Sequence, residues 1–182
     1  MTIPIDLSAI LVLVGLSMLG DETQQKPLEV VPGIDLKRYA GTWYEIARLP
    51  NRFQRECAGN VTATYTLLDD GTISVVNRCR KSNGEMTEAV GKARRSDNDG
   101  PNSKLEVRFA PAILSFLPFV WGNYWVIDLA DDYSYAVIGE PNREYLWILA
   151  RSGSIDEDTY GKILDRISRQ GYDISKLMRT GQ

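Results

Sequence analysis

Histidine is absent from the 182-residue sequence. This absence excludes Ser-His-Asp triads, Cys-His dyads, histidine-ligated zinc sites and histidine-based proton switches. Only two cysteines, Cys57 and Cys79, are present, which is too few for a metal site built from thiolates. The sequence therefore predicts no metal centre and no cofactor, and it favours a binding protein over an enzyme.

An excess of charge of either sign is also lacking. The chain carries 21 basic and 24 acidic residues, a net charge of −3, so no general binding of nucleic acid is expected. With 43% hydrophobic residues, the composition is too apolar for a disordered chain. The length suits one domain, and no internal linker divides it.

Long hydrophobic runs are absent apart from residues 7–20. This run has the length of a signal peptide and is short for a membrane span, although no Lys or Arg precedes it. A polar, proline-containing stretch follows. We expect residues 1–30 to be a signal-like segment with a polar linker, and residues 31–182 to form the folded domain. An uncleaved apolar anchor is the alternative.

Alternation of apolar and polar residues predicts eight strands separated by short turns. This pattern favours an all-β fold, an eight-stranded up-and-down antiparallel barrel. The expected strands are residues 43–49, 60–68, 72–80, 88–94, 104–110, 123–129, 133–139 and 145–151. One C-terminal helix ending near Arg169 is expected to pack its apolar face on the barrel. Residues 172–177 are expected to add a short edge strand.

Three segments of the sequence carry a recognisable signature. Gly41 and Trp43 form a G-x-W motif on the first strand, Asp132 and Tyr133 precede the seventh strand, and Arg151 closes the eighth. The surrounding segments GTWYEIARLPNRFQ, VTATYTLLDDGTISVVNRCR, YWVIDLADDYSYAVI and YLWILARS extend the match over most of the chain. The sequence thus resembles the lipocalin family, in particular the bacterial lipocalins of outer-membrane lipoprotein type and the apolipoprotein D group.

The resemblance implies a function as well as a fold. In lipocalins the signature Arg lies across the Trp at the closed end of the barrel, where a cation–π contact stabilises it. A carrier is implied, which binds and stores or transports a fatty acid or lysophospholipid for maintenance of a bacterial envelope. The implied location is the periplasm or the outer membrane. The bacterial relatives are acylated on a Cys after the signal, and this chain has no Cys before Cys57.

Alternation and the barrel topology predict which side chains face a ligand. An eight-stranded barrel is wide enough to hold one small ligand. Tyr65, Phe109 and Trp125 also align with positions that line the pocket of apolipoprotein D. The alternative is that the inward side chains simply fill the barrel. The residues expected at the ligand are Val61, Ala63, Tyr65, Val75, Asn77, Leu105, Val107, Phe109, Trp125 and Ile127.

The open end is expected to combine an apolar loop with basic side chains. Residues 110–121 are unusually apolar, and exposed patches of this kind mark partners or membranes. Membrane contact, or contact with a second copy in a homodimer, is expected through Ile113, Leu114, Phe116, Leu117 and Phe119. A rim favouring a phosphate-bearing head group is expected from Arg52, Arg55, Arg80, Lys81 and Arg143. The alternative is a loop folded over its own barrel, with ordinary solvated charges.

The cysteines and one carboxylate bear on the alternative functions. A Cys57–Cys79 disulfide needs a bulge to bring the second and third strands into register, and two free buried thiols are the alternative. A few lipocalins are enzymes that act on lipids, and here only Cys79 and Glu45 are candidates for such chemistry. A disulfide would remove Cys79 from that role. A binder of another small hydrophobic ligand, such as a pigment, is the third hypothesis.

Overall fold

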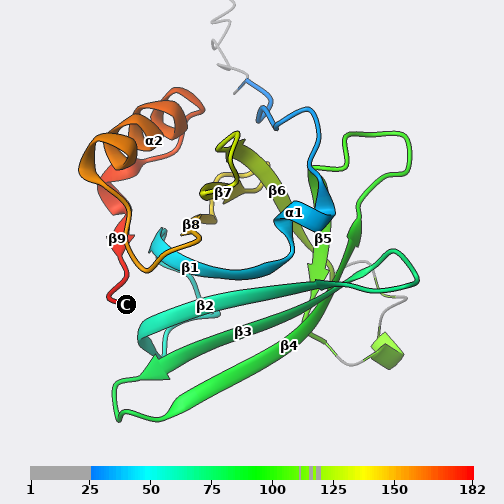
Figure 1. Cartoon of the computed structure of the whole chain (residues 1–182), viewed down its shortest axis with the longest axis horizontal. Coiled ribbons are helices and arrows are strands. Elements are labelled where there is room, and N and C mark those ends of the chain that lie inside the picture. Colours follow the sequence, from blue (N-terminus) through cyan, green and yellow to red (C-terminus); the bar gives the residue numbers. More distant parts are fainter. Residues whose placement is uncertain (1–25, 111, 115–116, 118–119) are drawn as a thin grey trace, which may run out of the picture.

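Eight antiparallel strands form a closed barrel in the computed structural model, which describes residues 26–110, 112–114, 117 and 120–182 (Figure 1). The barrel closes because β1 (Gly41–Arg48) pairs with both β2 (Cys57–Leu67) and β8 (Leu146–Ala150). The strands between them follow in chain order: β3 (Ile73–Lys81), β4 (Met86–Arg95), β5 (Lys104–Arg108), β6 (Gly122–Leu129) and β7 (Tyr135–Gly139). The predicted up-and-down barrel is confirmed.

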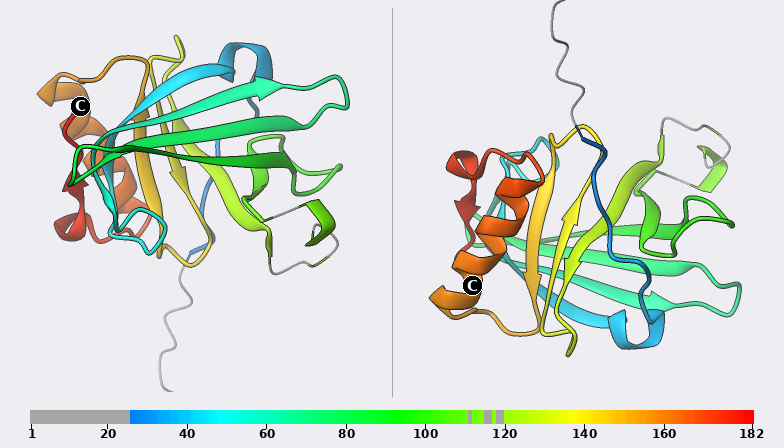
Figure 2. Two further views of the ribbon diagram at one scale, coloured as in Figure 1. Left: turned by 90° about the horizontal axis from the view of Figure 1, so that it is seen from below. Right: turned by 90° about the horizontal axis from the view of Figure 1, so that it is seen from above.

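Helices lie at one end and on one side of the barrel. The short α1 (Leu36–Tyr39) begins after Asp35, whose carboxylate accepts hydrogen bonds from two backbone amides of the first turn. The long α2 (Glu157–Arg169) begins after Asp156, which caps the amide of Thr159. It lies against the outside of the barrel (Figure 2). Two short 3-10 segments are η1 (Ala112–Leu114) and η3 (Ile174–Lys176). In the part of the chain that the structure describes, no helix has the length and apolarity needed to cross a membrane.

The buried core has two layers, one inside the barrel and one under α2. The inner layer gathers around Trp43 and Tyr39. The outer layer packs Ile163 and Ile167 of α2 against the barrel wall. Leu28 is buried in this outer layer, so the expected polar linker ends earlier than residue 30 and the folded domain begins before residue 31.

The C-terminal edge strand lies later in the chain than expected. Residues 174–176 form η3, and the edge strand is β9 (Met178–Arg179), which pairs with β1. Beyond β9, the tail enters the seam where β1 and β2 separate. The amide of Thr180 donates to the carbonyl of Ile46 (2.9 Å), and the amide of Asn60 donates to the carbonyl of Gly181 (2.7 Å). Residues 178–182, the C-terminal tail, are therefore part of the barrel wall.

Cys57 and Cys79 form a disulfide between β2 and β3, with their Cα atoms 5.5 Å apart. The register of these strands shifts on either side of Gly59. This irregularity supplies the bulge that the sequence required. The predicted disulfide is confirmed, and the alternative of two free thiols is wrong.

Candidate ligand cavity

The signature residues meet at the end of the barrel that carries α1, which we call the closed end. The guanidinium of Arg151 lies 3.8 Å from the centre of the Trp43 ring. Trp43 has no exposed surface, and its Nε1 donates to the carbonyl of Tyr39 (2.8 Å). Gly41 has a φ of +97°, and a Cβ there would lie 3.3 Å from Arg151 Nη1. The first and last strands are thus joined across the closed end.

The Asp132–Tyr133 pair holds α1 in place from the other side of the closed end. The amide of Asp35 donates to the hydroxyl of Tyr133 (2.8 Å). The guanidinium of Arg38 stacks 4.0 Å from the centre of the Tyr133 ring. Asp132 turns the chain by accepting from the amide of Ser134 (2.9 Å). These contacts make the closed end a structural region that supports the cavity above it.

A cavity of about 940 Å³ occupies the barrel toward its other end, which we call the open end. This volume lies within the range of small-molecule sites. Trp147, Leu149 and Ile138 also line it. The predicted residues that the structure places on its wall are Val61, Ala63, Tyr65, Val75, Asn77, Val107 and Phe109.

Three residues predicted at the ligand lie elsewhere. Leu105 is inside the barrel but below the floor of the cavity. Trp125 and Ile127 face outward, where they pack with the layer under α2, and Lys104 Nζ lies 4.2 Å from the centre of the Trp125 ring. The residues of β6 that point inward are Tyr124 and Val126. The alternation on β6 was therefore assigned to the wrong face.

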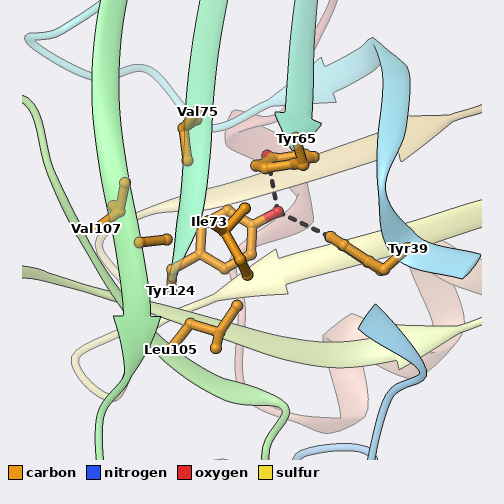
Figure 3. A pocket seen from close by; sticks show the side chains of 8 residues that line it. Tyr39, Tyr65, Ile73, Val75, Leu105, Val107 and Tyr124 are labelled. Carbon is orange, nitrogen blue, oxygen red and sulfur yellow. Dashed lines mark hydrogen bonds between the residues drawn. The ribbon is translucent and has the colours of Figure 1, made fainter. Parts of the chain in front are cut away.

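Three tyrosine hydroxyls form a short chain of hydrogen bonds at the floor of the cavity (Figure 3). Tyr124 lies in the middle, with its hydroxyl 2.8 Å from that of Tyr39 and 2.9 Å from that of Tyr65. Burial raises the pKa of Tyr65 to about 12 and raises the pKa of Tyr39 and of Tyr124 well above the usual range. All three are therefore neutral phenols near neutral pH, and the floor carries no charge.

A polar network crosses the upper wall of the cavity. Glu45 is 2% exposed, and its carboxylate pairs with Arg48. The same carboxylate accepts from Gln54 Nε2 (2.6 Å) and from the hydroxyl of Thr180 in the C-terminal tail (2.6 Å). Gln54 in turn accepts from Trp147 Nε1 (2.8 Å). The buried carboxylate is thus paired and fully engaged, as buried charges must be.

Asn77 is the polar exception in the middle of the wall. It lies on β3 opposite Ala63 and Ala89, and all three line the cavity. Its buried Oδ1 accepts no hydrogen bond from the described residues. Because an unpaired buried polar atom costs about 1–3 kcal/mol, this amide favours a ligand or a water that can donate to it.

The basic rim is smaller than predicted. Arg52 and Arg55 are exposed and lie at the opening of the cavity. Lys81 forms an ion pair with Glu56 (3.0 Å). Arg80 and Arg143 are not among the cavity-lining residues. The Arg143 guanidinium donates instead to three backbone carbonyls, those of residues 26, 141 and 170, so it fixes chain segments together and is not available to a head group.

The loop between β5 and β6, whose ends at residues 109–110 and 120–121 line the cavity, presents apolar side chains. Ile113 is 79% exposed, Leu114 is 37% exposed and Leu117 is half-buried. The predicted contact residues Phe116 and Phe119 lie outside the described residues. Phe53, which was not predicted, is 63% exposed on the other loop at the opening, between Arg52 and Arg55. Its place between two arginines was the available sequence signal.

Two features of the site were missed from the sequence. Tyr124 is one, because alternation on β6 does not separate the pair Tyr124 and Val126 from the pair Trp125 and Ile127. Gln54 is the other: it lies in a polar loop, and no neighbouring residue in the sequence indicates its hydrogen bonds to Glu45 and Trp147.

Comparison with known proteins agrees with this architecture. A family model described as "Lipocalin-like domain" matches residues 34–182. Temperature-induced lipocalin-1 of Arabidopsis thaliana is 45% identical over 161 residues, covering 88% of this chain and 86% of that protein. Outer membrane lipoprotein Blc of Escherichia coli K12 is 38% identical, covering 86% and 84%. Apolipoprotein D of Mus musculus is 33% identical, covering 84% and 79%.

Solved structures show the same fold at low sequence identity. Apocrustacyanin C1 superposes with a TM-score of 0.64 at 18% identity, covering 84% of this chain and 91% of that one. Insecticyanin from the tobacco hornworm Manduca sexta superposes with a TM-score of 0.64 at 21% identity, covering 85% and 84%.

Proposed function

Because this chain belongs to the lipocalin family, whose members bind small hydrophobic ligands, we propose that its cavity binds a fatty acid or a lysophospholipid. The observation that carries this proposal is the cavity of about 940 Å³. Its wall is mostly aliphatic and aromatic, with a few polar groups such as Asn77. Such a lining suits an acyl chain with a polar group near the middle or the opening.

The location follows from the relatives and from the cysteines. We infer export to a cell envelope, a role supported by the bacterial relatives named outer membrane lipoproteins. A disulfide suits an oxidising compartment. The sequence holds only two cysteines and both are in the disulfide, so neither is free to carry a lipid anchor.

We propose binding without catalysis. Cys79 has no free thiol while the disulfide is intact. The carboxylate of Glu45 is engaged by Arg48, Gln54 and Thr180. Neither group is therefore poised as a nucleophile or a general base, which counts against an enzyme that acts on lipids.

Native mass spectrometry of the purified protein should detect one fatty acid or lysophospholipid per chain, and empty protein should take up either lipid when it is added. Ala63→Trp should weaken uptake at least tenfold, because the indole would occupy the middle of the cavity. Thr66→Trp, on the opposite face of the same strand, should bind as the wild type does, since Thr66 is exposed and does not line the cavity.

Three results would contradict the proposal that the cavity binds a lipid. Wild-type protein that neither carries nor takes up either lipid class would exclude it. A coloured protein with a bound chromophore and no lipid would instead support the pigment-binding alternative. Equal loss of uptake in both Trp variants would show that uptake does not take place in the cavity.

We further propose that the open end contacts a lipid surface. Phe53 is exposed at the opening, and Ile113 is exposed on the loop whose ends, residues 109–110 and 120–121, line the cavity. Arg52 and Arg55 flank Phe53, and they suit the phosphates of a membrane surface. A homodimer through the same apolar side chains is the competing use of this surface.

Replacing Phe53 and Ile113 together by Ser should weaken binding to anionic phospholipid vesicles at least tenfold, because each side chain contributes about 1.5–3 kcal/mol when it is buried. Co-sedimentation measures this effect. The matched control replaces by Ser two apolar residues, Leu68 and Val90, that are exposed and do not line the opening. Unchanged sedimentation of the first variant would exclude membrane contact, and a loss of dimer in light scattering would favour the homodimer.

A further inference from the structure

The floor of the cavity is a thin partition with a second space beneath it. That lower space is a void of about 10 Å³, room for about one water. It lies toward the closed end, and Tyr39, Ile73, Ala93 and Leu105 line it without touching the main cavity. The two spaces are thus stacked along the barrel and do not form one chamber.

Four side chains line both spaces and therefore form the partition. They are Tyr65, Val75, Val107 and Tyr124, as the two sets of lining residues show. Tyr124 and Tyr65 are the largest of the four, and their rings meet edge to face with centres 5.9 Å apart. The hydroxyl of Tyr124 lies between those of Tyr39 and Tyr65 and is hydrogen-bonded to both (Figure 3). This bonding fixes the Tyr124 ring across the barrel.

We propose that Tyr124, held by Tyr65 and Tyr39, sets the depth of the cavity and so the longest acyl chain that it buries completely. The proposal rests on the lipid-binding function proposed above, and it names the residues that select among ligands of that class. Each methylene that enters an apolar cavity tightens binding about fourfold. The gain stops when the end of the chain reaches the partition, so affinity should rise with chain length and then level off.

Three variants test the partition, with saturated fatty acids of increasing length as the probe. Tyr124→Ala removes the ring and joins the two spaces. The chain length at which affinity stops rising should therefore increase by about four methylenes, an estimate based on the apolar area of the ring that is removed. Tyr124→Phe loses the hydroxyl but keeps the ring and its edge-to-face packing on Tyr65, so levelling off should move less than in Tyr124→Ala. Val107→Phe adds a ring to the partition from β5, so levelling off should move to shorter chains.

Affinities would be measured by displacement of a fluorescent fatty acid, at probe concentrations below micelle formation. The proposal is overturned if either Val107→Phe or a folded Tyr124→Ala levels off at the wild-type length, or if Tyr124→Phe moves the limit as far as Tyr124→Ala does. Val107→Phe keeps the test decisive if Tyr124→Ala fails to fold. If the wild type binds no fatty acid of any length, the lipid proposal itself fails, which is a separate outcome.

Discussion

Trp43→Ala should lower the free energy of unfolding by about 3–5 kcal/mol, because a large side chain is removed from a fully buried site. Trp43 has no exposed surface, and it connects the carbonyl of Tyr39 to the guanidinium of Arg151. Urea unfolding followed by far-ultraviolet circular dichroism measures the change, since this signal does not depend on the tryptophan that is removed.

Trp125 is the matched control for this experiment. It is half-buried on the outer face of β6, packed beside Lys104 and the layer under α2. Trp125→Ala should cost less than half as much as Trp43→Ala. Equal losses would mean that the contacts at the closed end add nothing beyond ordinary burial. Trp43→Phe should fall between wild type and Trp43→Ala, because it keeps a ring and loses the hydrogen bond to Tyr39.

Removing either partner of the Glu45–Arg48 pair should be about as costly. Both side chains are nearly buried, and each single variant leaves a buried charge without its partner. Glu45→Leu or Arg48→Met should therefore lower the free energy of unfolding by about 3–5 kcal/mol. The double variant removes both charges, so it should be more stable than either single variant. Urea unfolding followed by tryptophan fluorescence would compare the four proteins.

The coupling between the two variants is the decisive quantity. If the losses of the single variants simply add in the double variant, the pair is screened by solvent and the carboxylate is held mainly by Gln54 and Thr180. The same experiment informs the cavity, because Glu45 forms part of its wall and Gln54 lies at its opening. Lipid uptake by the double variant would show whether the charges take part in binding.

The barrel and its closed end were predictable because their residues satisfy several requirements at once. Gly41 has a positive φ, Trp43 is fully buried, and Arg151 lies across the indole. Each of the three stands at or near the start or the end of a strand that alternation predicts. The disulfide was favoured over two free thiols from the sequence, and the register shifts at Gly59 bring the two strands into the position that it needs. Local pattern and long-range pairing agree at these positions.

The faces of β6 could not be predicted in the same way. Alternation separates inside from outside only where the outer face meets water, and on β6 both Val126 and Ile127 are buried. The outer face is covered by α2 and by the segment around Leu28, which bury apolar side chains as well as the cavity does. An additional register shift between Val126 and Asp128 changes the alternation farther along the strand. The faces of β6 therefore depend on tertiary packing.

The basic side chains at the opening could not all be predicted, for a different physical reason. An arginine on a turn predicts an exposed charge, but it does not tell whether nearby carbonyls will use its donors. Arg143 lies on such a turn with a φ of +59°, and its guanidinium donates hydrogen bonds to backbone carbonyls. Arg52 and Arg55 have no ion pair within the described residues, so only they match the expectation at the opening.

The C-terminal tail decides where this protein can be labelled. The side-chain amide of Gln182 donates to the carbonyls of Glu45 (2.6 Å) and Val61 (3.1 Å), so a tag or fluorophore joined after Gln182 would begin between β1 and β2 of the barrel wall. A label there would disturb the hydrogen bonds that fill this seam. Asp69, exposed in the turn between β2 and β3 at the closed end, is the better attachment point, since its backbone does not have the positive φ of Gly71 in the same turn.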